Sequence, residues 1–210
     1  MKTRHILLAT GMIGSLVASG AKADWASDLI YPNSYTENPG SYSFQATATG
    51  DVYAYFAGSG AGGENSISLL VNGVATPDSA AGVFDDFTTQ VGQSVKLGSV
   101  NAGDTLVFRL NLVPGYYYDN YPTAWYSDVT QNGDGMNHIY SRAFAGDQGA
   151  GIPAGTYVAF EDLKKGDSDY NYYDNTFVFS TVAVPEPETY AMFMAGLGLL
   201  GVAARRRNCL

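Results

Sequence analysis

The sequence predicts an all-β protein built as a β-sandwich. Its 210 residues include 25 glycines and 16 tyrosines, and only 15% of the residues are charged. Charged residues usually make up about a quarter of a globular chain and glycine about 7%, so this composition favours strands and turns. Apolar residues also alternate with polar ones at a period of two, with almost no helical period. Short strands separated by polar turns are typical of a sandwich.

The first 23 residues have the pattern of a secretory signal peptide. Lys2 and Arg4 precede an apolar stretch at 6–18, and Ala-Lys-Ala follows at 21–23. The small residues fit the cleft of signal peptidase, and about 13 apolar residues are too few to span a bilayer. We therefore expect signal peptidase to cleave after residue 23 and to leave an exported domain at 24–183.

Seven segments of this domain alternate as strands do, and we expect about eight short strands. The segments are 41–49, 52–57, 65–71, 106–112, 136–143, 156–160 and 176–182. The dipeptides Gly50-Asp51 and Asn72-Gly73 indicate tight turns, the first of which predicts a hairpin between 41–49 and 52–57. The one cysteine, Cys209, lies outside the domain. About 160 residues can bury a sufficient core without a disulfide.

The charge of the exported domain favours a partnership with divalent cations. Residues 24–184 contain five basic and 18 acidic residues, a net charge of −13. Such a surface repels nucleic acid and anionic polysaccharide unless divalent cations intervene. Calcium prefers six to eight oxygen ligands from carboxylates, amides and carbonyls. It is therefore the cofactor that the sequence predicts.

Two acidic segments supply candidate calcium ligands. The segment 128–134 has oxygen side chains at alternate positions, like the start of an EF-hand loop, but Ile139 stands where the twelfth residue would be glutamate. The second segment holds five carboxylates within 161–174. The alternative is a solvated acidic hairpin without an ion. The candidate ligands are Asp134, Asn137, Glu161, Asp162, Asp167, Asp169 and Asn171.

An aromatic segment at 114–126 is a candidate glycan-binding surface. Aromatic faces beside polar side chains suit sugar rings, which have apolar faces and polar edges. The alternative, which we favour, is that these rings cover an edge of the sandwich. The candidate residues are Tyr116, Tyr117, Tyr121, Trp125 and Tyr126.

The sequence predicts no catalytic activity. His138 is the only histidine outside the signal peptide, and no Ser-His-Asp order or histidine-rich metal motif is present. Paired carboxylates such as Glu161 and Asp169 leave a glycosidase as an open alternative. We expect a non-enzymatic protein.

The C-terminal residues 184–210 form a separate targeting segment. Val184-Pro185-Glu186-Pro187 is followed by an apolar run at 189–204 and by Arg205-Arg206-Arg207. Sixteen helical residues reach about 24 Å, and bilayer thinning or arginine snorkelling can cover the shortfall from the hydrocarbon core. We therefore predict a transmembrane helix over 189–204 with the arginine end in the cytoplasm.

This tail closely resembles the PEP-CTERM sorting signal of Gram-negative bacteria in its order of Pro-Glu-Pro, span and basic cluster. The resemblance implies processing by an exosortase, a membrane cysteine protease, and an association with exopolysaccharide and biofilm. It also implies export across the inner membrane, a transient anchor there, and final placement at the cell surface or outside the cell. A permanent C-terminal anchor is the alternative.

A second resemblance covers the acidic segments. The blocks F-E-D-L at 160–163, G-D-x-D-Y-N at 166–171 and N-G-D-G-M-N-H at 132–138 are similar to those of a family of bacterial extracellular domains of unknown function. That resemblance implies a sandwich with a calcium site. Here Tyr172 and Tyr173 separate the block from Asp174, so Asp174 is not assigned as an equivalent position.

Taken with the charge, these features predict a secreted or surface-sorted protein of the extracellular matrix or biofilm. Its expected partners are signal peptidase, exosortase and calcium, with exopolysaccharide as a candidate and nucleic acid excluded. A carbohydrate-binding module is the first alternative function. A glycan-processing enzyme is the second.

Overall fold

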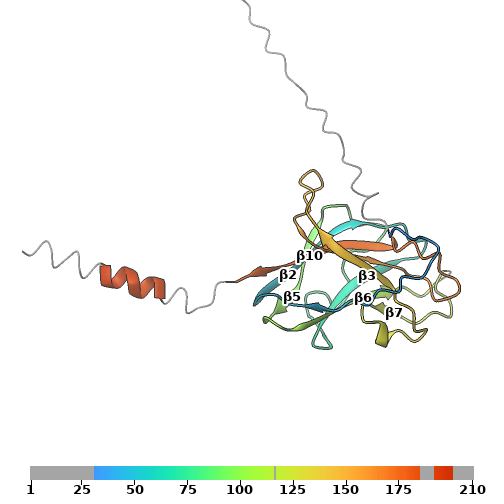
Figure 1. Cartoon of the computed structure of the whole chain (residues 1–210), viewed down its shortest axis with the longest axis horizontal. Coiled ribbons are helices and arrows are strands. Elements are labelled where there is room, and N and C mark those ends of the chain that lie inside the picture. The colour runs from blue at the N-terminus through green and yellow to red at the C-terminus, as the bar shows by residue number, and fades with distance from the viewer. Residues whose placement is uncertain (1–30, 116, 185–191, 201–210) are drawn as a thin grey trace, which may run out of the picture.

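Two antiparallel sheets face each other in the computed structural model, which describes residues 31–115, 117–184 and 192–200 (Figure 1). The first sheet has the order β1-β6-β3-β4, with β7 also paired to β6, and the second has the order β5-β2-β10-β9-β8. The strands of the first sheet are β1 (Phe44–Gln45), β3 (Asn65–Val71), β4 (Val74–Ala75), β6 (Thr105–Leu112) and β7 (Ala124–Tyr126). Those of the second are β2 (Gly50–Gly58), β5 (Ser94–Val100), β8 (Ile139–Phe144), β9 (Gly155–Phe160) and β10 (Asn175–Ala183). A 3-10 turn, η1, spans Val129–Gln131. The predicted all-β sandwich agrees with this arrangement.

The core lies between the sheets because alternate residues of each strand point inward. Phe108 of β6 contacts Phe177 and Phe179 of β10, with ring centroids 5.1 and 4.7 Å apart. Burying a side chain of this size contributes about 1.5–3 kcal/mol. The largest buried side chains of this layer include Phe56, Ile67, Leu69, Leu97, Leu106, Leu110, Trp125 and Phe160.

The outer face of the second sheet is covered as well. Tyr157 and Val178 alternate with the core residues of their strands and join a second buried cluster with Tyr31 and Tyr172. The Tyr31 and Tyr172 rings meet edge to face at 4.9 Å. The Tyr172 hydroxyl donates to Asn137 O (3.0 Å). This packing holds the loop at 163–173 against the sheet.

Six of the seven predicted strands are confirmed to within three residues at either end, and the segment 65–71 coincides with β3. The Asn72-Gly73 turn is confirmed between β3 and β4, with φ of 50° and 83° at its two residues. Three strands were not predicted: β4, β5 and β7. In β5, Ser94-Val95-Lys96-Leu97 alternates, but a register shift against β2 at Leu97 interrupts the pattern before Val100.

The predicted hairpin around Gly50 is wrong. Only two residues of the segment 41–49 form a strand, β1, which pairs with β6 in the other sheet. Gly50 itself begins β2 and lies against β10, where a Cβ would stand 2.1 Å from Val182 O. Glycine is needed here for the close approach of two strands, which a single sequence does not distinguish from a turn.

The two targeting segments fall largely outside the described residues. This applies to the signal peptide at 1–23, to the motif residues 185–187 and to Arg205, Arg206 and Arg207. Of the predicted transmembrane segment, residues 192–200 are helical. Across 31–115, 117–184 and 192–200, no helix has the length and apolar character needed to cross a membrane. The predicted transmembrane helix is therefore not shown.

Candidate metal centre

Strand register brings three carboxylates together at one end of the second sheet. Glu161 and Asp162 directly follow β9, and Asp174 directly precedes β10. Because β9 and β10 are antiparallel and Asn175 pairs with Phe160, the residues flanking that pair meet at the same end. One oxygen from each of the three carboxylates lies within 4.8 Å of the others.

These acids are buried without a counter-charge. Glu161, Asp162 and Asp174 are 0%, 3% and 5% exposed. Glu161 Oε1 accepts from Leu163 N (3.2 Å), but Oε2 has no hydrogen-bond partner. In the described part of the chain, no salt bridge reaches any of the three. Burying a carboxylate without a partner costs free energy, so the three acids lack a compensating positive charge.

Burial changes the proton affinity of each acid in the same direction. It raises the pKa of Glu161 to about 7 and raises the pKa of Asp162. Burial, followed by the charges of Asp162 and Glu161, raises the pKa of Asp174 well above its usual value. At neutral pH the site therefore holds protons unless a cation replaces them.

A stacked Trp125–His138 pair fixes the backbone of two of these residues. The Trp125 Nε1–H group donates to Asp162 O (2.7 Å), and His138 Nδ1 donates to Glu161 O (2.8 Å). The two rings are 3.8 Å apart and nearly parallel, at 11°. Both side chains are almost fully buried. The carbonyl groups next to the carboxylates are thus held by rigid aromatic donors.

Tyr118 connects the site to the loop that precedes β7. Its hydroxyl lies 2.5 Å from Asp162 Oδ2 and 2.9 Å from Gly63 O. One hydroxyl hydrogen serves only one of these two acceptors, and Gly63 O also accepts from Asn65 Nδ2 (3.4 Å). Asp162 N in turn donates to Asp174 Oδ2 (3.0 Å).

Asp86 is a further buried acid close to this group. Asp86 Oδ1 accepts from Asn65 N (2.7 Å), whereas Oδ2 is buried without a partner. Burial raises its pKa to about 6, and the charge of Asp162 adds a small part. No sequence pattern points to Asp86, because it lies in a loop far along the chain from 161–174.

Only two of the seven predicted ligands, Glu161 and Asp162, belong to the group. Asp174, left unassigned because of the inserted tyrosines, is its third member. The segments 156–160 and 176–182 were predicted as strands, but their pairing was not, and this pairing of β9 with β10 places Asp174 opposite the other two acids.

The other five predicted ligands have separate roles. Asp134 accepts from Met136 N and Lys165 N and lies 3.1 Å from His138 Nε2, and these contacts outweigh burial and lower its pKa. The Asn137 amide donates to Asn38 O and Gly40 O. Asp167 contacts the Tyr121 hydroxyl and Lys164. Asp169 and Asn171 order their own turn.

The predicted aromatic surface is divided between two environments. Trp125 is 2% exposed and is not accessible to a sugar. Tyr126, its neighbour in β7, points to the opposite face of that strand. Tyr117 is 53% exposed and lies over Gly62, and Tyr121 is partly buried beneath Lys164 Nζ, 4.6 Å from its ring centre. Tyr116 lies outside the described residues. The four described rings therefore do not form one face.

The donor set suits a hard divalent cation. All three side chains offer oxygen, which calcium and magnesium prefer, and there is no sulfur ligand. Calcium–oxygen distances of 2.3–2.6 Å place ligands on opposite sides of the ion about 4.6–5.2 Å apart. The spacing of the three oxygens, within 4.8 Å, fits that range.

The fold and this centre define a β-sandwich with a buried acidic site, and the tail indicates how the protein is sorted. Residues 183–207 match the PEP-CTERM protein-sorting motif. This motif marks a protein that is exported, anchored through the membrane and processed by an exosortase. No curated protein and no solved structure matches the chain. The resemblance of the acidic segments to a family of extracellular domains is not confirmed by these comparisons.

Proposed function

We propose that this secreted or surface protein acts non-enzymatically in the extracellular matrix and that calcium bound by Glu161, Asp162 and Asp174 stabilises its sandwich. The observation that carries the proposal is Glu161 Oε2, a fully buried carboxylate oxygen without a partner beside two further buried acids. Calcium supplies the missing positive charge. It is also abundant outside cells, where sites of millimolar to submillimolar affinity are filled.

The position of the site supports a structural role. The three carboxylates connect the end of β9 to the start of β10 and close the loop at 163–173. The Tyr118 hydroxyl contacts Asp162 and so connects the loop before β7 to the site. An ion there would hold three segments that are distant in sequence. Side chains at most 5% exposed are not accessible to a polymeric substrate, which favours stabilisation over glycan cleavage.

Terbium luminescence tests the proposed site directly. Tb³⁺ replaces calcium at oxygen sites and is excited by nearby aromatic rings, and Trp125 donates to the backbone of Asp162. We expect Tb³⁺ added to the protein to luminesce on excitation of tryptophan, and calcium to displace it. Glu161→Gln should lose the signal, and Trp125→Phe should reduce it while leaving Tb³⁺ bound.

Asp119→Asn is the matched control for the loss of one negative charge. Asp119 is exposed in the loop that carries Tyr118, so this variant should bind Tb³⁺ as the wild type does. An equal loss of Tb³⁺ luminescence in Asp119→Asn and Glu161→Gln would show that Tb³⁺ binds diffusely to the acidic surface. That result would contradict a specific site.

A second prediction concerns the Trp125 donor. Trp125→Phe keeps an aromatic ring against His138 but removes the Nε1–H bond to Asp162 O. Partners that orient metal ligands typically contribute a factor of about 10–100 in affinity. We expect calorimetric titration with calcium to show a dissociation constant about tenfold higher in Trp125→Phe. An unchanged constant would exclude this role for Trp125.

A further inference from the structure

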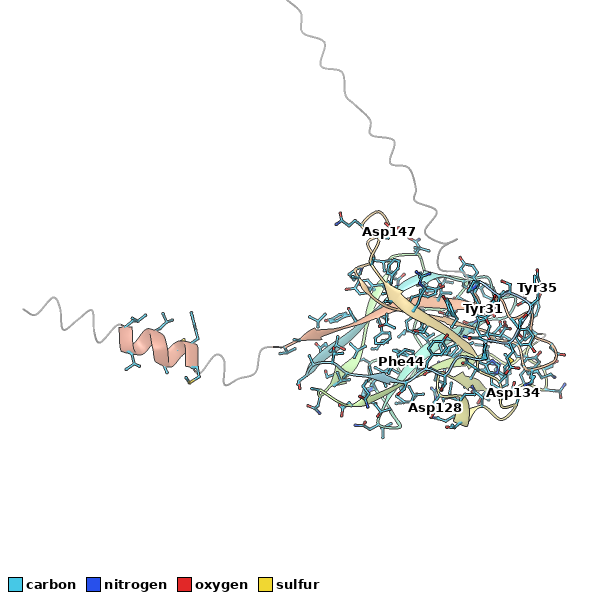
Figure 2. All side chains as sticks on the ribbon, viewed as in Figure 1. Tyr31, Tyr35, Phe44, Asp128, Asp134 and Asp147 are labelled. Carbon is cyan, nitrogen blue, oxygen red and sulfur yellow. The ribbon has the colours of Figure 1, made fainter. Side chains whose placement is uncertain are left out.

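The C-terminal end of β10 has one paired and one open edge. On the β2 side, pairing continues to Ala183, which lies opposite Gly50. On the β9 side, pairing stops at Phe179, opposite Thr156. Among the described residues, no strand pairs with 180–183 on that second side. Figure 1 shows this end of β10 projecting from the sandwich, and the acidic centre lies at the other end, where Figure 2 labels Asp134.

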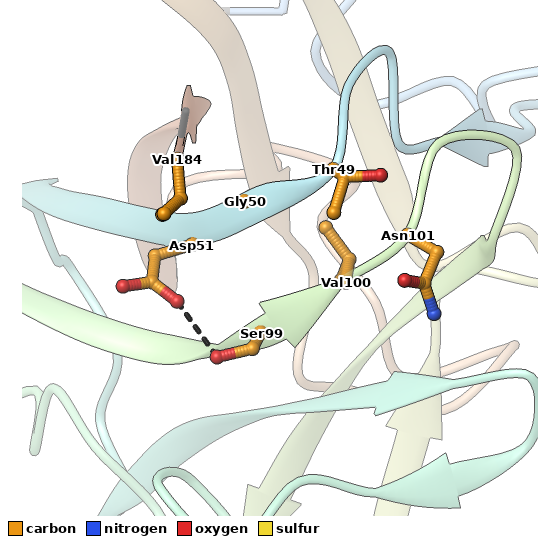
Figure 3. Close-up of a pocket in the computed structure, with 7 residues that line it drawn as sticks. All are labelled: Thr49, Gly50, Asp51, Ser99, Val100, Asn101 and Val184. Carbon is orange, nitrogen blue, oxygen red and sulfur yellow. Dashed lines mark hydrogen bonds between the residues drawn. The ribbon is translucent and has the colours of Figure 1, made fainter. Parts of the chain in front are cut away.

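The hydrogen bonds to β2 define which backbone groups are open. Val184 N donates to Thr49 O (3.3 Å), and Figure 3 shows Val184 beside Gly50 at the start of β2. Alternate residues of an antiparallel strand direct their N–H and C=O groups to opposite neighbours. The backbone groups of Thr181 and Ala183 therefore face the open side.

The open edge lacks the features that usually protect an edge strand. Natural edges carry lysine, proline, bulges or covering loops, whereas 175–184 contains no charged residue and no proline. Val182 and Val184 are 50% and 53% exposed. A cavity of about 400 Å³ adjoins the edge, lined in part by Phe44, Thr156, Phe179 and Thr181.

This edge is continuous with the sorting motif. The motif match begins at residue 183, so its first two residues lie on the folded domain: Ala183 is paired opposite Gly50 of β2, and Val184 N donates to Thr49 O. An enzyme that reads the motif meets a folded strand with one edge available. Adding a strand to such an edge is a common way to bind an extended segment.

We infer that exosortase docks on the folded domain by adding an extended segment of its own to the open edge of β10 at 180–184. This inference rests on the proposed processing by an exosortase and is independent of calcium. Docking there positions the Pro185-Glu186-Pro187 segment without detaching β10 from β2. The competing route is that the enzyme peels the end of β10 away before it binds.

Single substitutions separate the two routes in cells that express exosortase with the full chain. Thr181→Pro removes the N–H group on the open edge and places its ring there, without removing a bond to β2. Thr181→Ala keeps the N–H group and is the matched control. Gly50→Ala weakens the attachment of β10, because its Cβ would overlap Val182 O.

Under the proposal, pulse-chase labelling should show Thr181→Pro processed about tenfold more slowly than wild type, with Thr181→Ala unchanged and Gly50→Ala no faster. Wild-type processing of Thr181→Pro, or faster processing of Gly50→Ala, would overturn it. A chain with Pro185, Glu186 and Pro187 replaced by alanine must stay unprocessed. Its normal processing would instead show that the sorting motif does not direct processing of this chain.

Photo-crosslinking gives a readout that does not depend on how well Thr181→Pro folds. A photoreactive residue at Val182 should capture exosortase, and one at Val74, which is 72% exposed at the far edge of the first sheet, should not. Capture of only a second copy of the chain at Val182 would overturn the proposal, because the edge would then serve self-association.

Discussion

Glu161→Gln is expected to stabilise the calcium-free protein and to abolish its stabilisation by calcium. Without an ion and at pH 7.5, above the raised pKa of Glu161, the substitution removes a buried charge that faces Asp162 and Asp174. Replacing buried charged groups by uncharged side chains of similar volume is neutral or stabilises by up to about 1–4 kcal/mol. Thermal unfolding in calcium-free buffer should therefore show a higher midpoint for Glu161→Gln than for the wild type.

Calcium should raise the unfolding midpoint of the wild type but not that of Glu161→Gln. For a dissociation constant of about 0.1 mM and about 1 mM calcium, linkage gives near 1.4 kcal/mol. For a domain of roughly 160 residues this raises the midpoint by about 3–6 °C. Asp119→Asn should respond as the wild type does. Overlapping wild-type melting curves with calcium and with chelator would reject the site.

The calcium-free wild type is expected to lose stability as the pH rises from about 5 to 7.5. The pKa of Glu161 is raised from 4.5 to about 7 on folding, chiefly by burial, so the folded chain binds a proton more tightly than the unfolded chain. Stability linked to a raised acid pKa is complete below the unfolded value and is lost as pH rises to the folded value. For Glu161 alone this amounts to about 3 kcal/mol.

The other acids do not reverse this trend. The pKa values of Asp162, Asp174 and Asp86 are raised as well, so these acids act in the same direction. The acids whose pKa is lowered, such as Asp134 and Asp167, are ionised throughout the window and change stability only at lower pH.

Urea unfolding at pH 5.0 and 7.5, in buffer stripped of calcium by a chelating resin, measures the effect. Glu161→Gln should show a smaller fall in the free energy of unfolding than the wild type, and saturating calcium should offset the fall at pH 7.5. An equal change in the wild type and Glu161→Gln between pH 5.0 and 7.5 would contradict the raised pKa of Glu161, because His138, whose pKa burial lowers, acts in the opposite direction in both proteins.

The sequence by itself determined the class of fold and the sorting tail. Alternation marks β6 because Leu106, Phe108, Leu110 and Leu112 all enter the core from one face of the strand, and a local pattern is sufficient to show that. The Pro-Glu-Pro motif with its apolar and basic segments is also local. The density of acidic residues at 161–174 also indicated a metal site in that segment.

Tertiary structure decided which acids meet and which edges stay open. Asp174 joins Glu161 because β9 pairs with β10, while Asp134 is held by His138 and Lys165 N in a different role. Trp125 is a buried donor rather than a surface platform. The Gly50-Asp51 dipeptide predicted a turn, yet Gly50 begins β2 and allows β10 to pack closely against it. Each outcome depends on contacts between residues far apart in sequence, which local patterns do not encode.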